Sequence, residues 1–290
     1  MPIKQSQDQL KSVIDRLSII KYIFNKGLEQ SNYPFPACSM SLLLLHDAVE
    51  MFLFLAAEVN SAQLKSNCNF VDYWDALEKV LGKNIPSDRT SIGIRLNKAR
   101  VGLKHLGITL PKEEILNFCT TVRSFFLENT TAIFDIDFEA ISFSDLIHAD
   151  KVKKALIASG EHWKGNNKKL AVESLADAFY EINLSFIIFI NKYCPSLYSE
   201  IPRYGGIGSI LEDVTYELVK MTVTHNFIDY LRFKSLTPTI LDRSENRPGN
   251  YKYSMTYNIE NVTSKDYDFC CKFIIDTAIN LQEVVGKYNY

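Results

Sequence analysis

The chain lacks the cysteine spacing of a metal centre or a disulfide framework. Its cysteines form no Cys-x-x-Cys pair and have no paired histidines nearby in the sequence. Zinc sites and disulfide-rich domains depend on such spacing, so we expect neither a metal nor another cofactor. Reduced core thiols are usual in cytoplasmic proteins, and we expect that location here. The six positions are Cys38, Cys68, Cys119, Cys194, Cys270 and Cys271.

The chain also lacks the apolar segments that carry a protein into or across a membrane. Its first residues, MPIKQSQDQLKSV, contain no apolar run typical of a secretion signal. The most apolar stretch, residues 40–57, is interrupted by His46, Asp47 and Glu50, whereas a spanning helix needs about 20 predominantly apolar residues. We therefore expect no membrane association.

An excess of charge of either sign is absent as well. The net charge is −2, which provides no overall attraction to nucleic acid or to an anionic membrane. Binding of phosphate must then depend on a local cluster. A solvated helix face is the common explanation of a basic run, and a phosphate-binding surface is the alternative. One such run contains a single acid, Asp88, and five bases: Arg89, Arg95, Lys98, Arg100 and Lys104.

The spacing of apolar residues predicts an all-α protein. An acidic, aromatic segment, residues 135–139, is expected to connect two helical halves. Alternating tyrosines within residues 238–258 favour a small β-hairpin or an ordered loop. Residues 205–209 (GGIGS) are a poor match to a phosphate-binding loop, because no lysine follows the last glycine. Apolar positions three and four residues apart, typical of amphipathic helices, occur within residues 6–30, 39–60, 70–81, 88–106, 115–134, 168–193, 210–234 and 264–285, and in a helix that starts near residue 148.

Two segments repeat in one register, 130 residues apart. Residues 45–50 (LHDAVE) align with residues 175–180 (LADAFY), and residues 104–106 (KHL) align with residues 234–236 (KSL). Polar residues of the first copy change as a set in the second, while the apolar positions persist: His46 to Ala176, Glu50 to Tyr180, Arg100 to Tyr230 and His105 to Ser235. Groups needed only for packing would not be expected to disappear together. The repeat therefore predicts two domains, residues 1–135 with the polar set and residues 145–290 without it.

Arg100 and His105 lie near the end of the basic helix, which is expected to stop at Gly107. Five residues at 100° each place them about 140° apart on an ideal helix. They converge within one chain only if the helix unwinds near Gly102 or Gly107, or if the arginine curls round. Otherwise they meet partners from a second subunit. His46 and Glu50 are one helical turn apart and share a face, so they either satisfy each other in a packed helix or belong to the same site.

A helix containing His-Asp-Ala-Val-Glu, followed about fifty residues later by Arg-x-x-x-x-His, resembles the HEPN superfamily of all-α domains. The resemblance covers residues 6–134 well and residues 145–288 as a degenerate second copy. Many HEPN proteins are metal-independent ribonucleases, often toxins or anti-phage effectors, in which two domains pair and the arginine and histidine line the cleft between them. The resemblance implies tandem helical bundles, a homodimer or larger assembly, and a site at Arg100 and His105, with Glu50 where the family often has an acid.

Cleavage of RNA through its own 2′-hydroxyl requires a base, and a histidine that titrates near neutrality is suited to removing that proton. His105 is the expected base. Negative charge builds up on the phosphorus oxygens in the transition state, and the guanidinium of Arg100 can bind two of them. Glu50, with His46, would orient the arginine or the histidine. Three bases would hold flanking phosphates with little sequence preference: Lys104, Arg95 and Lys98.

The expected partner is RNA, with transfer RNA as one candidate, and a cognate antitoxin or effector protein is a further candidate. Two other functions stay open on the sequence. One is a non-catalytic module that binds nucleotide, RNA or a partner protein as a regulatory subunit, and the other is a plain structural subunit. Cleavage of RNA by the purified protein, absent from an Arg100→Ala/His105→Ala variant, would separate the enzyme from both.

Overall fold

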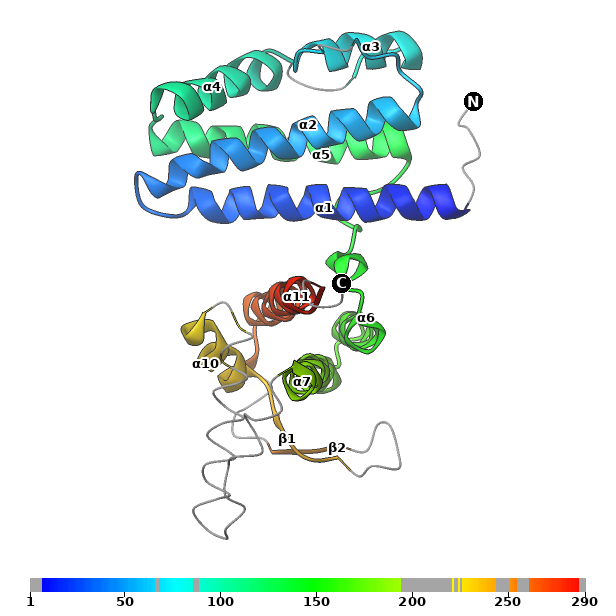
Figure 1. Cartoon of the computed structure of the whole chain (residues 1–290), viewed down its shortest axis with the longest axis vertical. Coiled ribbons are helices and arrows are strands. Elements are labelled where there is room, and N and C mark those ends of the chain that lie inside the picture. The colour runs from blue at the N-terminus through cyan, green and yellow to red at the C-terminus, as the bar shows by residue number, and fades with distance from the viewer. Residues whose placement is uncertain are drawn as a thin grey trace. The chain divides into compact units, whose positions relative to one another are not determined.

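The structure is a computed structural model that describes residues 7–65, 68–85, 89–193, 221, 224, 226–243, 251–254 and 261–286 (Figure 1). Helices make up most of these residues, which confirms the all-α prediction. The chain divides into two compact units, Met1–Asp145 and Leu146–Tyr290, and a short 3₁₀ helix, η3 (Phe143–Leu146), lies at the division. Each unit has a hydrophobic core of its own.

The first unit is a helical bundle built around α2 (Ser41–Val59). This helix packs against α1 (Gln7–Ser31), α3 (Asp72–Leu81), α4 (Asn97–Leu106) and α5 (Lys112–Phe134). In Figure 1, α1, α2 and α5 run alongside one another, and α3 and α4 lie over α2. A helix surrounded in this way must be apolar on most sides, which explains the composition of α2.

One helical stretch of the described chain, Ala37–Val59, is long and apolar enough to cross a bilayer. It comprises a 3₁₀ turn, η1 (Ala37–Met40), and α2. Within its most apolar window, 61% is buried inside the protein, and Leu45, Ala48 and Phe52 are fully enclosed. The stretch is therefore packed as the central helix of the first unit.

Apolar spacing predicts one continuous α-helix for the basic segment of the first unit, and the structure differs from this prediction. The segment contains a π-helix, η2 (Thr90–Leu96), and continues as α4. In a π-helix, hydrogen bonds join residues five apart; such helices are rare and frequently occur at functional sites. Gly93 is buried in η2, where an added Cβ would lie 3.8 Å from the Trp74 ring. Residues 86–88, at the expected start of this helix, lie outside the described residues.

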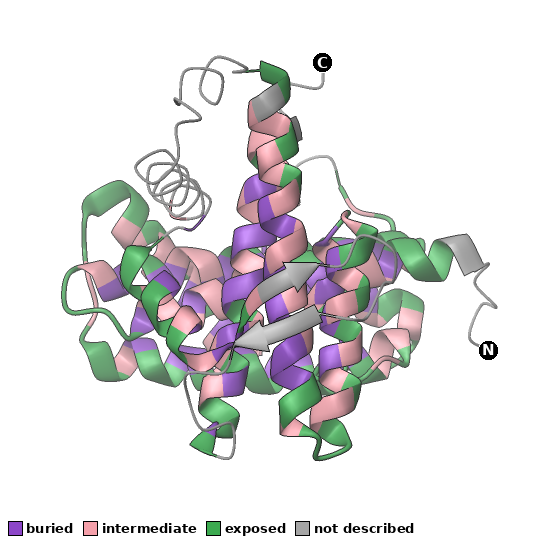
Figure 2. Cartoon of the chain, turned by 90° about the horizontal axis from the view of Figure 1, so that it is seen from below, coloured by how far each residue is buried: buried purple, intermediate pink, exposed green. Residues whose placement is uncertain are grey.

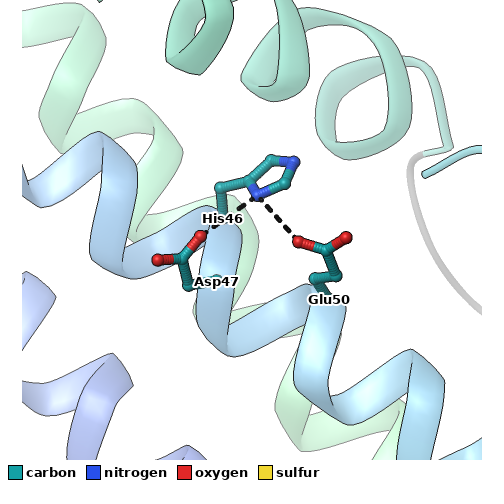
Figure 3. Close-up of side chains that lie close together, drawn as sticks. All are labelled: His46, Asp47 and Glu50. Carbon is teal, nitrogen blue, oxygen red and sulfur yellow. Dashed lines mark ion pairs between the residues drawn. The ribbon is translucent and has the colours of Figure 1, made fainter. Parts of the chain in front are cut away.

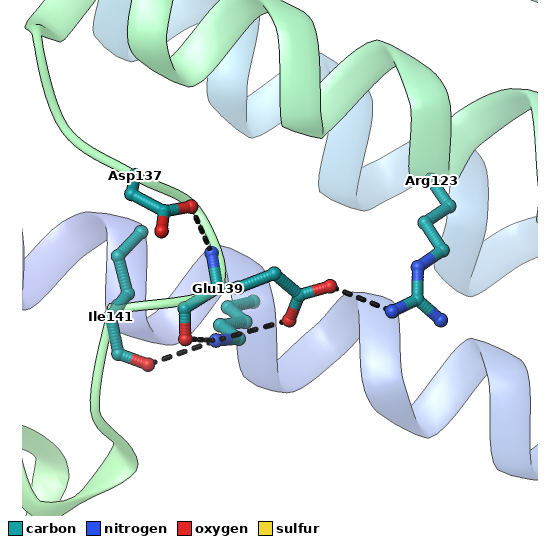
Figure 4. A network of polar contacts seen from close by, with 5 residues as sticks. Arg123, Asp137, Glu139 and Ile141 are labelled. Atoms are coloured by element: carbon teal, nitrogen blue, oxygen red, sulfur yellow. Dashed lines mark hydrogen bonds and ion pairs between the residues drawn. The ribbon is translucent and has the colours of Figure 1, made fainter.

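The segment after α5, expected to be a connection, is instead packed onto the first unit. Phe138 and Ile141 are buried in its core. The buried Lys21 Nζ donates hydrogen bonds to the carbonyl oxygens of Glu139 and Ile141, at 2.9 and 3.0 Å, and Arg123 donates to the Glu139 carboxylate at 2.7 Å (Figure 4). Burial lowers the pKa of Lys21, and the charge of Glu139 opposes that effect. These contacts hold the end of the unit against its helices.

The second unit also consists mainly of helices. α7 (Lys168–Tyr193) packs against α6 (Asp150–Lys164) and α11 (Ser264–Gly286), and α11 packs against α10 (Phe227–Leu236). Figure 2 shows buried residues along the inner sides of the helices and exposed residues along their outer sides. This is the amphipathic arrangement that three-and-four spacing predicts.

The sequence leaves two alternatives for residues 238–258, and the structure contains the hairpin. β1 (Thr239–Arg243) pairs antiparallel with β2 (Tyr251–Ser254), with Ile240 opposite Tyr253. The register shifts by one residue after Ile240. Most of the expected helix over residues 210–234 and the glycine-rich residues 205–209 lie outside the described residues.

Candidate active site in the first unit

His46 lies on α2 with its ring enclosed. The residue is 2% exposed because α2 occupies the middle of the bundle. Its ring stacks on the ring of Phe70, with centroids 4.2 Å apart and planes inclined by 30°. Phe70 belongs to the segment that precedes α3, and no spacing in the sequence connects it to His46. The sequence therefore missed this contact.

Two carboxylates of α2 lie beside the imidazole, as Figure 3 shows. His46 Nδ1 is 3.6 Å from Asp47 Oδ1 and 3.7 Å from Glu50 Oε2. Both separations slightly exceed hydrogen-bonding distance, and neither ring nitrogen has a hydrogen-bond partner among the described residues. The structure thus places Glu50 beside His46, as their spacing predicted, and adds Asp47. Three ligand atoms of these residues lie within 4.8 Å of one another, which is close enough for a shared metal ion.

The pKa of His46 is lowered below its ordinary value. Burial is the largest cause, because it disfavours the charged imidazolium; Glu50 raises the pKa, and the positive Arg100 lowers it. Arg100 belongs to α4, which packs on α2. His46, Glu50 and Arg100, from two helices, therefore form one electrostatic cluster in which both charges act on the imidazole. A neutral imidazole in this position can donate or accept a hydrogen bond.

The side chain of Arg100 is half-buried. Its Nε is buried and has no hydrogen-bond partner in the described chain. A buried donor without an acceptor costs about 1–3 kcal/mol, and an acceptor from a bound ligand would remove that cost. A guanidinium is also suited to two oxygens of one phosphate or carboxylate. Arg100 is thus the residue of this cluster best placed to bind an anion.

His105 lies apart from this cluster. It is exposed and occupies the last turn of α4, which ends at Gly107 with a left-handed φ of 66°. α4 stays α-helical through Gly102, so the separation of about 140° between Arg100 and His105 applies. The helix does not unwind to bring them together. Of the three alternatives left by the sequence, convergence by unwinding at Gly102 is excluded, and a curled arginine and a second subunit remain.

The bases expected to hold flanking phosphates have different surroundings. Lys98 and Lys104 are exposed on α4. Arg95 is exposed on η2, but it forms an ion pair with Glu114 at 3.4 Å. Arg89 is engaged more closely, at 2.7 Å from Asp75. The basic surface beside the site is therefore smaller than the count of bases in the sequence suggested.

A groove of about 600 Å³ adjoins the carboxylates of α2. Tyr73 of α3 contributes to its wall, and the sequence did not single out this residue. Burial raises the pKa of Tyr73, and Cys68 and Glu50 add to the effect. The groove gives Asp47 and Glu50 a side that faces solvent. Its lining residues are Arg16, Ile19, Ile20, Asp47, Glu50, Met51, Phe54 and Tyr73.

The counterparts of this cluster also gather in the second unit. Ala176, Tyr180 and Tyr230 line one cavity of about 80 Å³ between α7 and α10. In the repeat these three residues align with His46, Glu50 and Arg100. Residues that lie near one another in the first unit therefore align with residues that lie near one another in the second. Ser235, aligned with His105, is exposed. The residues that align with the charged cluster thus line a cavity that contains two tyrosines.

Comparison with known proteins identifies no relative of this chain. No family model, no curated protein and no solved structure matches the chain.

Proposed function

We propose that the chain is a metal-independent endoribonuclease of the HEPN type that cleaves RNA by attack of its own 2′-hydroxyl. The observation that carries the proposal is the cluster of His46 and Glu50 from α2 with Arg100 from α4. The same helix α4 also presents the exposed His105. The proposal draws on the sequence resemblance for the reaction and on the geometry for the roles of the residues.

In this mechanism, Arg100 binds two oxygens of the scissile phosphate and stabilises the charge that develops in the transition state. His105 removes the proton of the 2′-hydroxyl. Glu50, one helical turn from His46 on α2, orients the guanidinium, while neutral His46 adds no competing positive charge. Lys98 and Lys104, both exposed on α4, bind neighbouring phosphates with little dependence on sequence.

We further propose that the site is completed by a second copy of the chain. Arg100 and His105 point to different sides of an uninterrupted α4, so one phosphate is reached most directly by Arg100 of one copy and His105 of the other. Exposed apolar side chains near His105 support an interface there: Leu106 is 71% exposed and Ile108 is 55% exposed. Burial of such side chains is the usual driving force of association.

A ribonuclease without sequence preference would damage the cell that makes it. We therefore propose a cytoplasmic toxin or anti-phage effector that is restrained by an inhibitory partner. Transfer RNA and total RNA are both suitable substrates for a first assay.

Purified protein is incubated with transfer RNA or total RNA in the presence of EDTA. The wild type should produce fragments ending in 2′,3′-cyclic phosphate, and Arg100→Ala and His105→Ala should not. Two matched controls, Arg123→Ala and His148→Ala, remove an exposed arginine and an exposed histidine elsewhere and should keep full activity. Activity that disappears in EDTA and returns with magnesium would contradict the mechanism.

Subunit exchange tests the shared cleft. Inactive Arg100→Ala protein is mixed with inactive His105→Ala protein, and mixed dimers should recover part of the activity because one of their two clefts contains both intact residues. Exchange without recovery, or an active monomer in light scattering, would show that each chain forms its site alone.

The second candidate is a non-catalytic RNA-binding or partner-binding subunit. The exposed Leu106 and Ile108 favour a protein contact at the end of α4. RNA binding that Lys98→Ala and Lys104→Ala weaken, without cleavage under any of these conditions, would support this candidate over the enzyme.

A further inference from the structure

The imidazole of His46 faces two carboxylates without forming a hydrogen bond to either one. Nδ1 lies 3.6 Å from Asp47 Oδ1 and 3.7 Å from Glu50 Oε2 (Figure 3). The residue is 2% exposed, and both of its ring nitrogens are buried with no hydrogen-bond partner in the described parts of the chain. Buried polar atoms are normally paired, so this arrangement points to a group that the protein itself does not supply.

A divalent transition-metal ion would bind Nδ1 of His46 and one oxygen of each of the two carboxylates. In a tetrahedral zinc site with bonds of about 2.1 Å, ligand atoms lie about 3.4 Å from one another. The two separations from Nδ1 are only a few tenths of an ångström longer, and the three ligand atoms lie within 4.8 Å. The side chains of Asp47 and Glu50 are 52% and 44% exposed, so their carboxylates can rotate to close the remaining distance.

The surroundings favour zinc and provide an open side. Imidazole with carboxylates suits zinc, whereas calcium and magnesium prefer oxygen ligands alone. Asp47 and Glu50 also line the groove of about 600 Å³. Through it an ion can enter, and water can complete its coordination.

We propose that His46, Asp47 and Glu50 bind one zinc ion per chain, and that the bound ion inhibits the site. A metal ion bound by His46 and Glu50 repels the guanidinium of Arg100, whose positive charge already acts on the same imidazole. Zinc and an active arrangement of Arg100 therefore exclude each other. The binding stands independently of the proposed function, while the inhibition rests on it.

Binding is measured on the full-length chain without RNA, by titration calorimetry with zinc and by visible absorption with cobalt as a coloured substitute. The wild type should bind one ion per chain, and the cobalt spectrum should show ligand-field bands without thiolate charge transfer. Asp47→Asn and Glu50→Gln, which change half-exposed groups and preserve shape, should each weaken zinc binding about tenfold or more.

Three controls separate this site from other positions. Glu58→Gln removes an exposed acid of the same helix, and Cys68→Ser removes the half-buried thiol near α3; both should bind zinc like the wild type. Arg100→Ala should bind zinc more tightly, because a repelling charge is gone. No bound ion in the wild type, unchanged affinity in Asp47→Asn and Glu50→Gln, or a cobalt spectrum that depends on Cys68 would each overturn the proposal.

Inhibition is measured with Asp47→Asn, because Asp47 has no role in the proposed cleavage. This variant should cleave RNA like the wild type and resist zinc concentrations that stop the wild type. Equal inhibition of both proteins would overturn the regulatory part. A chain that binds zinc at this site but never cleaves RNA would refute the ribonuclease and leave the zinc site standing.

Discussion

Single residues of the candidate site differ mainly in burial. His46 is enclosed by α2 and the Phe70 ring, whereas His105 is exposed at the end of α4. Exposed residues contribute little to stability, and buried polar residues contribute through packing and desolvation. Substitutions at the two histidines should therefore have opposite signatures in stability and activity.

His105→Ala is expected to lower RNA cleavage by about 100-fold or more, the contribution typical of a general base. Its free energy of unfolding should stay within about 0.5 kcal/mol of the wild type, as for most surface substitutions. Cleavage assays and thermal melts measure the two quantities. His46→Ala is the comparison, and it should lower the melting temperature because it opens a cavity against Phe70. A His105→Ala protein that melts early would show a structural role instead.

The two cysteine thiols of α11 lead to a second prediction for single residues, which concerns the pH dependence of stability. Burial raises the pKa of Cys270 to about 12 and that of Cys271 to about 11. In the unfolded chain a thiol ionises near its ordinary pKa of 9.0, so the unfolded state loses protons first as the pH rises. The free energy of unfolding should therefore be unaffected by these thiols below pH 9 and should decrease above it.

Urea unfolding between pH 8 and pH 10.5 measures this decrease. Cys270→Ala/Cys271→Ala provides the control, because it should flatten the part of the pH dependence that the two thiols cause. Since the thiolate is the reactive form, iodoacetamide at pH 8 should leave Cys270, which is buried, unmodified in the folded protein, whereas Cys271 is only partly buried. Rapid modification of Cys270 would contradict its burial.

Among the elements, the end of α4 requires a glycine, because Gly107 has a left-handed backbone conformation. Gly107 has a φ of 66° and follows His105 by two residues, and Gly82 ends α3 in the same way with a φ of 63°. An added Cβ meets nothing within 4 Å at either position, so the effect of a substitution there is backbone strain alone. The two glycines form a matched pair, because Gly82 and Gly107 differ only in which helix each one ends.

Gly107→Ala and Gly82→Ala should each lower the free energy of unfolding by about 1–2 kcal/mol, the cost of a left-handed conformation for a residue with a Cβ. Only Gly107→Ala should also reduce RNA cleavage, because it disturbs the turn that presents His105. Chemical denaturation and the cleavage assay test the pair. Equal losses of activity in both variants would mean that global stability, not the end of α4, controls cleavage.

The molecule as a whole consists of two units with separate cores. Among the described residues, the buried apolar side chains of the first core lie between Val13 and Ile141, and those of the second lie between Ile147 and Leu281. A core that draws on one continuous stretch of chain is the property expected of an independently folding domain.

A fragment containing residues 1–145 is therefore expected to unfold in one cooperative transition. Calorimetry of this fragment is compared with a Phe52→Ala version of it, which removes a fully buried ring and should be destabilised by about 3–5 kcal/mol. A fragment without a cooperative transition, or one insensitive to Phe52→Ala, would show that the first unit needs the second in order to fold.

Local patterns in the sequence determined most of the secondary structure. α1, α2, α5, α7 and α11 begin and end within three residues of the ranges predicted from apolar spacing, because the period of a helix is a property of adjacent turns. The same reasoning placed His46 and Glu50 on one face of α2 and separated Arg100 from His105 on α4. These results need no knowledge of which helices are neighbours.

Tertiary structure decided the features that depend on residues far apart in the chain. The π-helical η2, the Phe70 ring on His46, the pairing of Arg95 with Glu114 and the burial of the segment after α5 all involve partners from other elements. The approach of Arg100 to His46 belongs to the same group. The sequence determined which side chains share a helix face, since that follows from backbone geometry alone, whereas the structure decided what each face meets, since that depends on how the helices pack.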